Sequence, residues 1–253
     1  MPDYHLYDDW IADKPHNEIK AYTDYSIGFL TRGCFRHCAF CVNRRSNKVV
    51  RHSPLVEFLD TSRKKICLLD DNFFGYDGWK NLLLQLKDTG KPFHFKQGLD
   101  VRLLDVTKAQ ILFSSKYDGD FIFAFDNIAD TPLIEEKLNL IRSVTNKNVK
   151  FYCFCGFDRT GKYNNDFWRH DVFDLLKRIE ILVKYKCYPY VMRFQKVYDS
   201  PLKSLYATIA AWANQPHIIK KLSLADYATA KGLKCLQLFD IGHFSSLKWE
   251  VQK

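Results

Sequence analysis

Apolar residues recur along this chain in short runs, separated by longer segments with helical apolar spacing. The runs are rich in β-branched and aromatic residues, which favours strands. They predict six strands, at residues 25–31, 65–69, 93–96, 121–125, 149–155 and 188–194. The clearest intervening helices are expected at residues 79–86, 104–113, 133–144 and 172–184. This alternation of strand and helix predicts an α/β fold.

The predicted strands are apolar along most of their length, which indicates burial on both faces. Such strands are typical of a parallel sheet that helices cover, either barrel-like or open. Helix-start signals support this frame, because Ser53-Pro54 and Asp130-Thr131-Pro132 each place a proline just after an N-capping residue. The first signal predicts a helix that begins near Pro54.

Three parts of the chain differ in their residue pattern. Residues 1–24 are polar and aromatic and are expected to form a short N-terminal extension. Residues 25–199 contain the strand and helix alternation and form the predicted core. Residues 200–253 lack further strands and have helical spacing at 205–212 and 222–230, which predicts a helical C-terminal appendage.

The composition fits a folded, soluble chain. Of its 253 residues, 47% are hydrophobic and 26% are charged, enough to bury a sizeable core. No run reaches the roughly 18 to 20 apolar residues of a membrane span, and the first residues lack the layout of a signal peptide. We therefore expect a cytoplasmic protein whose cysteines are reduced or bind metal.

Basic residues outnumber acidic ones, so the formal net charge is +9. Runs such as Arg63-Lys64-Lys65 and Lys220-Lys221 would attract a polyanion such as RNA or DNA. A solvated basic surface explains the same charge, because no nucleic-acid-binding motif accompanies it. The charge alone leaves both interpretations open.

Three of the eight cysteines lie close together after the first predicted strand. Cys34, Cys38 and Cys41 have C-x3-C-x2-C spacing, at the end of the sheet where α/β folds place active sites. Iron–sulfur clusters ordinarily have four cysteine ligands, and structural zinc sites have four Cys or His ligands. A set of three therefore leaves one metal position open to a reactant.

The segment 29–41 resembles the signature of the radical S-adenosylmethionine superfamily in its cysteine spacing, in Gly33 and in the aromatic Phe40. The resemblance implies that the three thiolates bind three irons of a [4Fe-4S] cluster and that S-adenosylmethionine binds the fourth, with Phe40 beside the cofactor. It also implies reductive cleavage to a 5′-deoxyadenosyl radical, with an electron from a flavodoxin- or ferredoxin-type donor. Since six units fall short of the eight of a full barrel, we expect a partial (β/α)6 TIM-like barrel.

The resemblance also assigns roles to polar residues at later strand ends. Asp71 and Asn72, after the second strand, are candidates to accept hydrogen bonds from the amino group of the cofactor. Asp100 and Arg102 follow the third strand, where Arg102 would pair with the cofactor carboxylate. A structural ion pair of Arg102 with Asp100 or Asp105 is the alternative.

Two further candidates follow the fourth and sixth strands. Asp126 would accept from the ribose hydroxyls of the cofactor, although an Asp-Asn turn needs no function. Arg193 would reach the substrate or the cofactor. Cys153 and Cys155 lie two residues apart on the fifth strand, where buried structural cysteine is an alternative to an auxiliary cluster or a hydrogen-donating thiol.

The resemblance covers residues 25–199 and is nearest to the cobalamin-dependent and methylthio-transferring branches. The chain has no room for a cobalamin domain and no second set of three cysteines, so neither reaction is expected. The hydrogen-donating substrate stays open, with a nucleic-acid base as one candidate. The alternative function is a nucleic-acid-binding module that holds zinc or a cluster without catalysis, with His37 or a distant cysteine as fourth ligand.

Overall fold

The structure is a computed structural model that describes residues 2–43 and 46–249. The chain is mixed α/β and forms two compact units, Met1–Ile122 and Phe123–Lys253. Each unit is built around a three-stranded sheet of its own, with strand orders β1-β4-β5 and β6-β7-β8. None of the helices in these described residues is long and apolar enough to cross a membrane.

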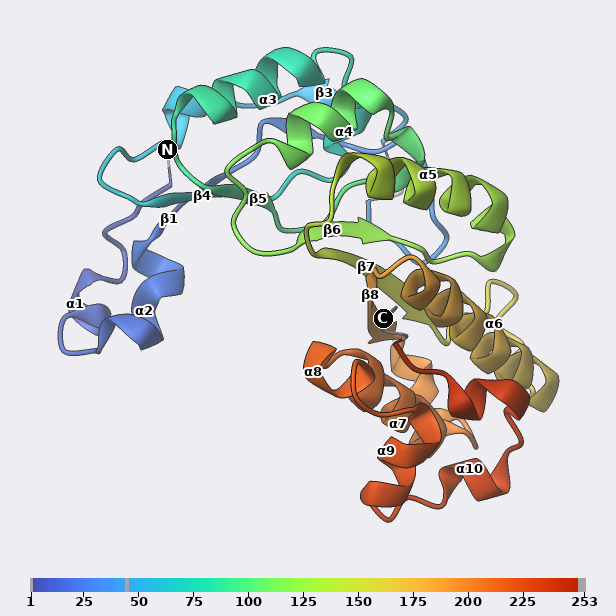
Figure 1. The fold of residues 1–253 in the computed structure, drawn as a ribbon. Coiled ribbons are helices and arrows are strands. Elements are labelled where there is room, and N and C mark those ends of the chain that lie inside the picture. Colours follow the sequence, from blue (N-terminus) through green and yellow to red (C-terminus); the bar gives the residue numbers. More distant parts are fainter. Residues whose placement is uncertain (1, 44–45, 250–253) are drawn as a thin grey trace. The chain divides into compact units, whose positions relative to one another are not determined.

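The first unit contains a parallel sheet with helices α3 (Trp79–Asp88) and α4 (Val106–Phe113) beside one another over it (Figure 1). Its strands are β1 (Tyr25–Gly28), β4 (Lys65–Leu68) and β5 (Phe93–Phe95). Helix α3 buries Leu82, Leu83 and Leu86, whose spacing of one turn places them on one face. Pairing of β1 with β4, and of β4 with β5, is parallel, as the apolar strands predict.

A short antiparallel ribbon encloses the cysteine loop. Strand β2 (Thr31–Arg32) pairs with β3 (Val50–Arg51), so that Arg32 lies opposite Val50. The predicted strand at residues 25–31 is therefore broken after β1. The cause is Asp70, whose carboxylate accepts hydrogen bonds from the backbone N–H groups of Leu30 and Thr31, at 3.3 and 2.6 Å, and draws these residues out of the sheet.

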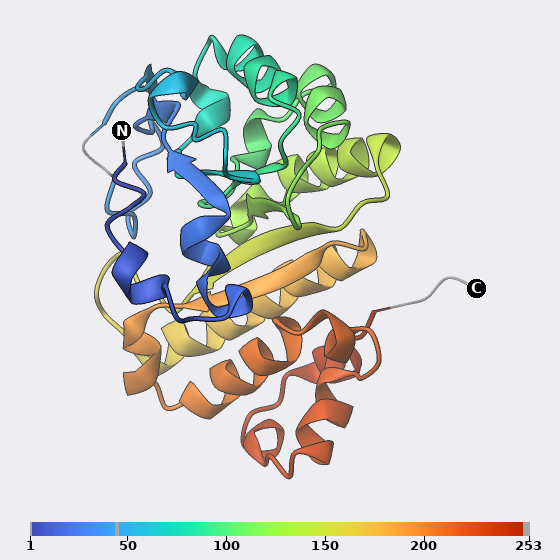
Figure 2. The same ribbon diagram turned by 90° about the vertical axis from the view of Figure 1, so that its left-hand side faces the viewer.

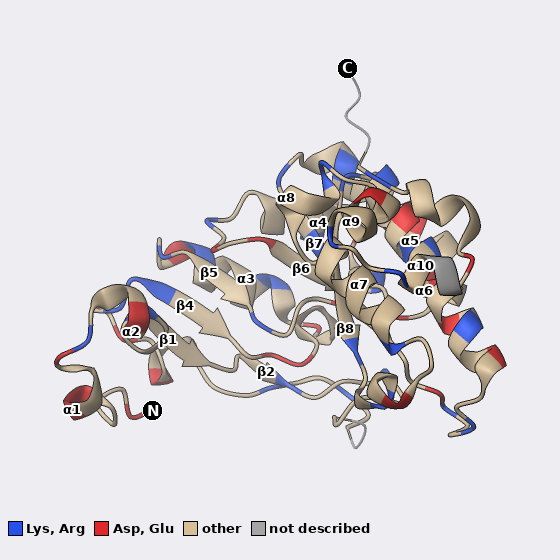
Figure 3. Cartoon of the chain, turned by 90° about the horizontal axis from the view of Figure 1, so that it is seen from below, with Lys and Arg blue, Asp and Glu red and all other residues tan. Residues whose placement is uncertain are grey.

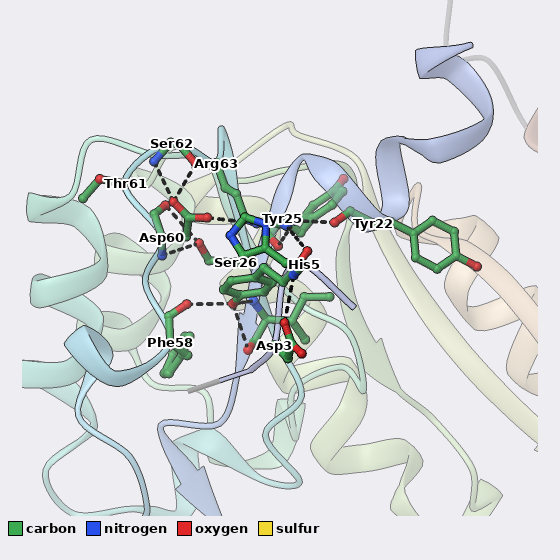
Figure 4. Close-up of polar contacts among 12 residues, drawn as sticks. Asp3, His5, Tyr22, Tyr25, Ser26, Phe58, Asp60, Thr61, Ser62 and Arg63 are labelled. Atoms are coloured by element: carbon green, nitrogen blue, oxygen red, sulfur yellow. Dashed lines mark hydrogen bonds and ion pairs between the residues drawn. The ribbon is translucent and has the colours of Figure 1, made fainter. Parts of the chain in front are cut away.

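The N-terminal extension contains two helices, α1 (Asp8–Ile11) and α2 (His16–Thr23), neither of which buries a residue. It is fastened to the sheet through Tyr4 and through Arg63, whose hydrogen bonds to Tyr22 and Tyr25 can be followed in Figure 4. The extension therefore depends on polar contacts rather than on a core of its own.

The second unit contains β6 (Phe121–Ala124), which crosses the boundary, together with β7 (Val149–Cys155) and β8 (Tyr188–Arg193). Strands β7 and β8 are parallel, and the 20-residue helix α6 (Asn165–Lys184) runs along them (Figure 2). Pro132 stands in the first turn of α5, as its position after Asp130 predicts. The remaining helices are α5 (Thr131–Val144), α7 (Lys203–Ala213), α8 (Pro216–Ile219), α9 (Leu224–Ala230) and α10 (Cys235–Leu238).

Short 3-10 helices occupy five loops that follow strands and one segment that follows α10. They lie at Leu55–Glu57, Phe73–Gly75, Val101–Leu103, Ile128–Asp130, Gln195–Asp199 and Gly242–Ser246.

Two sequence-based expectations need correction. The helix expected near Pro54 is only the single 3-10 turn Leu55–Glu57, because Phe58 is buried beneath it and Asp60 forms a turn with the backbone and hydroxyl of Ser62. Burial on both faces holds for most of β4, whereas β7 alternates between buried and half-buried residues. Within the described residues, no sheet closes into a barrel.

Candidate cofactor site

The three clustered cysteines lie in a loop of the first unit without regular structure. Cys34, Cys38 and Cys41 are free thiols of intermediate exposure, and no helix or strand is formed between Gly33 and Asn43. The backbone turns tightly where the N–H of Cys41 donates to the carbonyl of Cys38 at 2.9 Å. Half-exposed thiols in such a loop are accessible to metal and to a second reactant.

Gly33 makes the turn from β2 into the cysteine loop possible. Its φ of +94° is a backbone conformation that favours glycine, and a Cβ there would lie 2.4 Å from the carbonyl oxygen of Lys48. The glycine before Cys34, noted in the sequence as part of the cysteine signature, therefore has a steric role in this loop.

Asp71 holds the two ends of the cysteine loop together. Its Oδ2 accepts from the backbone N–H of Gly33 at 2.9 Å, and its Oδ1 accepts from the Nδ2 of Asn43 at 2.6 Å. These residues directly precede Cys34 and closely follow Cys41. The structure thus places Asp71 against the loop, with both carboxylate oxygens engaged by it.

Asn72 lies between the cysteine loop and the buried end of β4. It is 3% exposed, and its Nδ2 lies 3.4 Å from the sulfur of Cys34. Its Oδ1 is buried and has no hydrogen-bond partner in the described part of the chain. A buried acceptor without a donor is costly, which marks this atom as the place where a hydrogen-bond donor from a ligand would bind.

Asp70 precedes these two residues and performs a structural role. It is 1% exposed, and its Oδ1 also accepts from the hydroxyl of Thr31 at 2.6 Å. Burial raises the pKa of this carboxyl to about 6, although the hydrogen bonds from Thr31 and Leu30 oppose the shift. Asp70 therefore fixes the backbone of Leu30 and Thr31, just before the cysteine loop begins.

Arg102 forms an ion pair with Asp100, which is the alternative to cofactor binding that the sequence left open. Its Nε lies 2.7 Å from Oδ1 of Asp100, whose side chain is 10% exposed. Arg36, from the cysteine loop, contacts the other oxygen of Asp100 at 2.6 Å. Two guanidinium groups share one carboxylate, so the cluster keeps a net positive charge that suits an anionic group.

Asp126 and Arg193 belong to the second unit. Asp126 accepts from the backbone N–H of Phe154 at 2.9 Å, and the buried Arg178 donates to the carbonyls of Phe125 and Phe154 on either side. The guanidinium of Arg193 lies over the ring of Tyr198, 5.6 Å from its centre. Both residues therefore belong to the second unit, whereas the cysteine loop belongs to the first.

Cys153 and Cys155 are buried in the core of the second unit. They share one face of β7, as their spacing predicts, and are 0% and 2% exposed. Burial raises the pKa of Cys153 to about 12, and it also raises the pKa of Cys155. Both stay protonated at neutral pH, which favours a packing role over metal binding.

The cysteines are not drawn together as a metal ligand set. In residues 2–43 and 46–249, no group of three or more His, Cys, Asp or Glu side chains is arranged to hold a metal ion. Phe40, next to Cys41, is 36% exposed. Three thiols are the kind of ligand that an iron–sulfur cluster takes, and this loop would have to contract to bring them onto one cluster.

Two residues of this site, Arg36 and Asn43, are missing from the sequence-based candidates. Arg36 lies between Cys34 and Cys38, and the backbone N–H of Asn43 lies 3.4 Å from the sulfur of Cys41. Both residues lie within two positions of a cysteine in the sequence, and this proximity could have identified them. Their partners, Asp100 and Asp71, are distant in sequence and emerge only in the fold.

Comparison of this chain with protein-family models, with curated proteins and with solved structures finds no match. The resemblance to the radical S-adenosylmethionine superfamily therefore rests on the cysteine signature and on the residues at the strand ends.

Proposed function

We propose that this protein is a radical S-adenosylmethionine enzyme whose Cys34, Cys38 and Cys41 bind a [4Fe-4S] cluster. When bound, the cluster supplies the electron that cleaves S-adenosylmethionine into methionine and a 5′-deoxyadenosyl radical, which abstracts hydrogen from a substrate. A flavodoxin- or ferredoxin-type protein is the expected electron donor. A nucleic-acid base is one candidate substrate for a chain of net charge +9.

Asn72 is the observation that carries this proposal. Its Nδ2 faces the sulfur of Cys34, while its buried Oδ1 lacks a donor among the described residues. An ammonium group is a strong donor, and the amino group of the cofactor would satisfy this oxygen. A single amide would thus contact both a cluster ligand and the cofactor.

Asp71 and the Asp100 cluster support the same site. Asp71 keeps Gly33 and Asn43 close, which limits how far Cys34 and Cys41 can separate. Arg36 and Arg102 offer N–H donors around Asp100 to a carboxylate. We assign Arg102 to the carboxylate of the cofactor and Arg36 to the orientation of the cysteine loop.

Anoxic reconstitution with iron and sulfide tests this function. We expect about four irons and four sulfides per chain, and release of 5′-deoxyadenosine when dithionite and S-adenosylmethionine are added. Alanine variants of the three cysteines should lose both, whereas Cys235→Ala, far along the chain, should retain both. Cluster assembly without cofactor cleavage would refute the proposal.

We propose that the two three-stranded sheets together form a partial (β/α)6 barrel. The strands of each sheet follow one another in chain order, as consecutive strand–helix units of a barrel do. In the first unit, the N–H of Leu99, after β5, donates to the carbonyl of Ile122 in β6 at 2.8 Å. A crystal structure of the cluster-loaded protein with both sheets in one curved layer is the expected result.

The charge favours a second candidate function, a metal-bearing module that binds nucleic acid without catalysis. The distant cysteines Cys67, Cys153, Cys155, Cys187 and Cys235 are all buried, so His37 is the more accessible fourth ligand for zinc. Metal analysis of anoxically purified protein separates the two functions. About one zinc and no iron per chain would favour the module.

A further inference from the structure

A cavity of about 550 Å³ lies between the N-terminal extension and the β1 end of the first sheet. Its size is within the range of small-molecule sites. Aromatic side chains form much of its wall, with Tyr4, Tyr7 and Tyr22 from the extension and Phe29 and Phe58 from the sheet side. We call this space the N-terminal cavity.

The extension is held over this cavity by contacts that fix its position. The hydroxyl of Tyr4 donates to the carbonyl of Phe58 and accepts from the N–H of Ile27, both at 2.7 Å. The side chain of Arg63 donates to the carbonyls of Tyr22, Tyr25 and Tyr4. The wall formed by the extension is therefore anchored, which reduces the ordering cost of binding a ligand.

The charge of the cavity is opposite to that of the chain. Of the described residues that line it, the charged ones are Asp3 and Glu57, both acidic. Residues 1–24 carry six acidic and two lysine side chains, although the whole chain has a net charge of +9. Acidic segments are visible on α1 and α2 in Figure 3.

Nearby arginines are engaged elsewhere. Besides its three carbonyl acceptors, Arg63 pairs with Asp60 at 3.2 Å, and its guanidinium lies 4.0 Å from the centre of the Tyr4 ring. Arg32 stacks on the ring of Phe29, also at 4.0 Å. Among the described residues, no ion pair is formed by Glu57, so its carboxylate can receive a cation from a ligand.

We propose that the N-terminal cavity binds a small amine with an aromatic body. The ring would pack among Tyr4, Tyr22 and Phe58, where aromatic pairs add to apolar burial. The ammonium group would pair with Asp3 and Glu57. This site is separate from the proposed cofactor chemistry and needs no cluster.

Calorimetric titration of the full, metal-free chain tests this proposal with three probes of similar shape. 2-Phenylethylamine is cationic, 2-phenylethanol is neutral and phenylacetate is anionic. We expect the amine to bind up to about fivefold more tightly than the alcohol, since an exposed ion pair contributes up to about 1 kcal/mol, and the carboxylate to bind weakest.

Two sets of variants separate charge from shape. Asp3→Asn with Glu57→Gln should reduce the affinity of the amine to that of the alcohol and leave the alcohol unchanged. Tyr22→Ala should weaken both by several-fold, because it removes an aromatic wall. Tyr198→Ala, an exposed tyrosine of the second unit, is the matched control and should change neither.

The proposal is overturned if phenylacetate binds as tightly as the amine, or if the Asp3 and Glu57 variant keeps the preference for the amine. Absence of binding by all three probes to a chain that circular dichroism shows to be folded also overturns it.

Discussion

Asn72 and Asp71 are neighbours in sequence that contact different parts of the cysteine loop. The side chain of Asn72 reaches Cys34, whereas Asp71 contacts Gly33 and Asn43. Both residues are candidates from sequence, and the structure separates their roles. Asn72 offers a vacant buried acceptor, and Asp71 closes the loop.

Replacement of Asn72 by Ala should weaken binding of S-adenosylmethionine to the reconstituted protein. Loss of one charge-assisted hydrogen bond costs about 1.5 to 3 kcal/mol, so the Kd should rise by about tenfold or more. Calorimetry under anoxic conditions measures this. Asn139→Ala, at an exposed position of α5, is the control, and an unchanged Kd for Asn72→Ala would contradict the assignment.

Replacement of Asp71 by Ala should loosen the loop and weaken cluster binding. Loss of residues that position metal ligands typically lowers metal affinity by about 10- to 100-fold. Iron content after exposure to a graded chelator is the measurement. Asp77→Ala, at an exposed carboxylate in the same loop region, should retain iron like the unaltered chain. Equal chelator resistance of both variants would remove Asp71 from this role.

Asp70 should make the free energy of unfolding depend on pH. Its pKa is about 6 in the folded chain against an ordinary 3.8, so the folded state binds the proton more tightly. Its contribution is therefore greatest below about pH 4, falls by about 3 kcal/mol in all as the pH rises through 6, and is constant above about pH 7.

Denaturant unfolding of the metal-free chain and of Asp70→Asn, between pH 4 and 7, measures this contribution. The stability of the unaltered chain relative to the variant should decline between pH 4 and 6. A difference that stays constant over this range would contradict the assignment.

At the scale of elements, the N-terminal extension depends on Arg63 rather than on buried helices. Helices α1 and α2 bury no residue, while the side chain of Arg63 is 9% exposed and contacts three carbonyl groups of the segment from Tyr4 to Tyr25. The sequence shows a basic run at residues 63–65, but it does not distinguish the buried arginine from its exposed neighbours.

Replacement of Arg63 by Ala should release the extension. Three carbonyls and the carboxylate of Asp60 would lose their donor, which costs about 2 to 4 kcal/mol. Hydrogen exchange of residues 2–24 should accelerate, with little change in β7 and β8. Lys64→Ala is the matched control, since Lys64 is 69% exposed and 3.7 Å from Asp24. Equal exchange in both variants would contradict this role of Arg63.

For the molecule as a whole, the net charge of +9 predicts salt-dependent attraction of nucleic acid. Affinity for a single-stranded oligonucleotide, measured by fluorescence anisotropy, should fall by at least about tenfold between roughly 50 and 200 mM salt, as bound counterions are released. A neutral peptide nucleic acid of the same sequence should not bind. Salt-independent binding would show that the basic side chains do not contact the phosphates and are only a solvated part of the surface.

The sequence by itself determined the six strands of the two three-stranded sheets, except for where the first one ends, together with the four central helices and the position of the cysteine loop. Local pattern suffices for these, because runs such as Lys65–Leu68 and Val149–Cys155 are mostly apolar, β-branched or aromatic. The parallel pairing of these strands also follows from their composition.

Only the tertiary structure decided the contacts that shape the site. Asp70 breaks the first predicted strand, Asp100 joins Arg36 to Arg102, and Arg63 fastens the extension, across separations of 39 or more residues except for Arg102. Such contacts depend on which side chains the packed strands bring together, and local periodicity carries no information about them. The cysteine signature could therefore be read from the chain, whereas the vacant oxygen of Asn72 beside it required the fold.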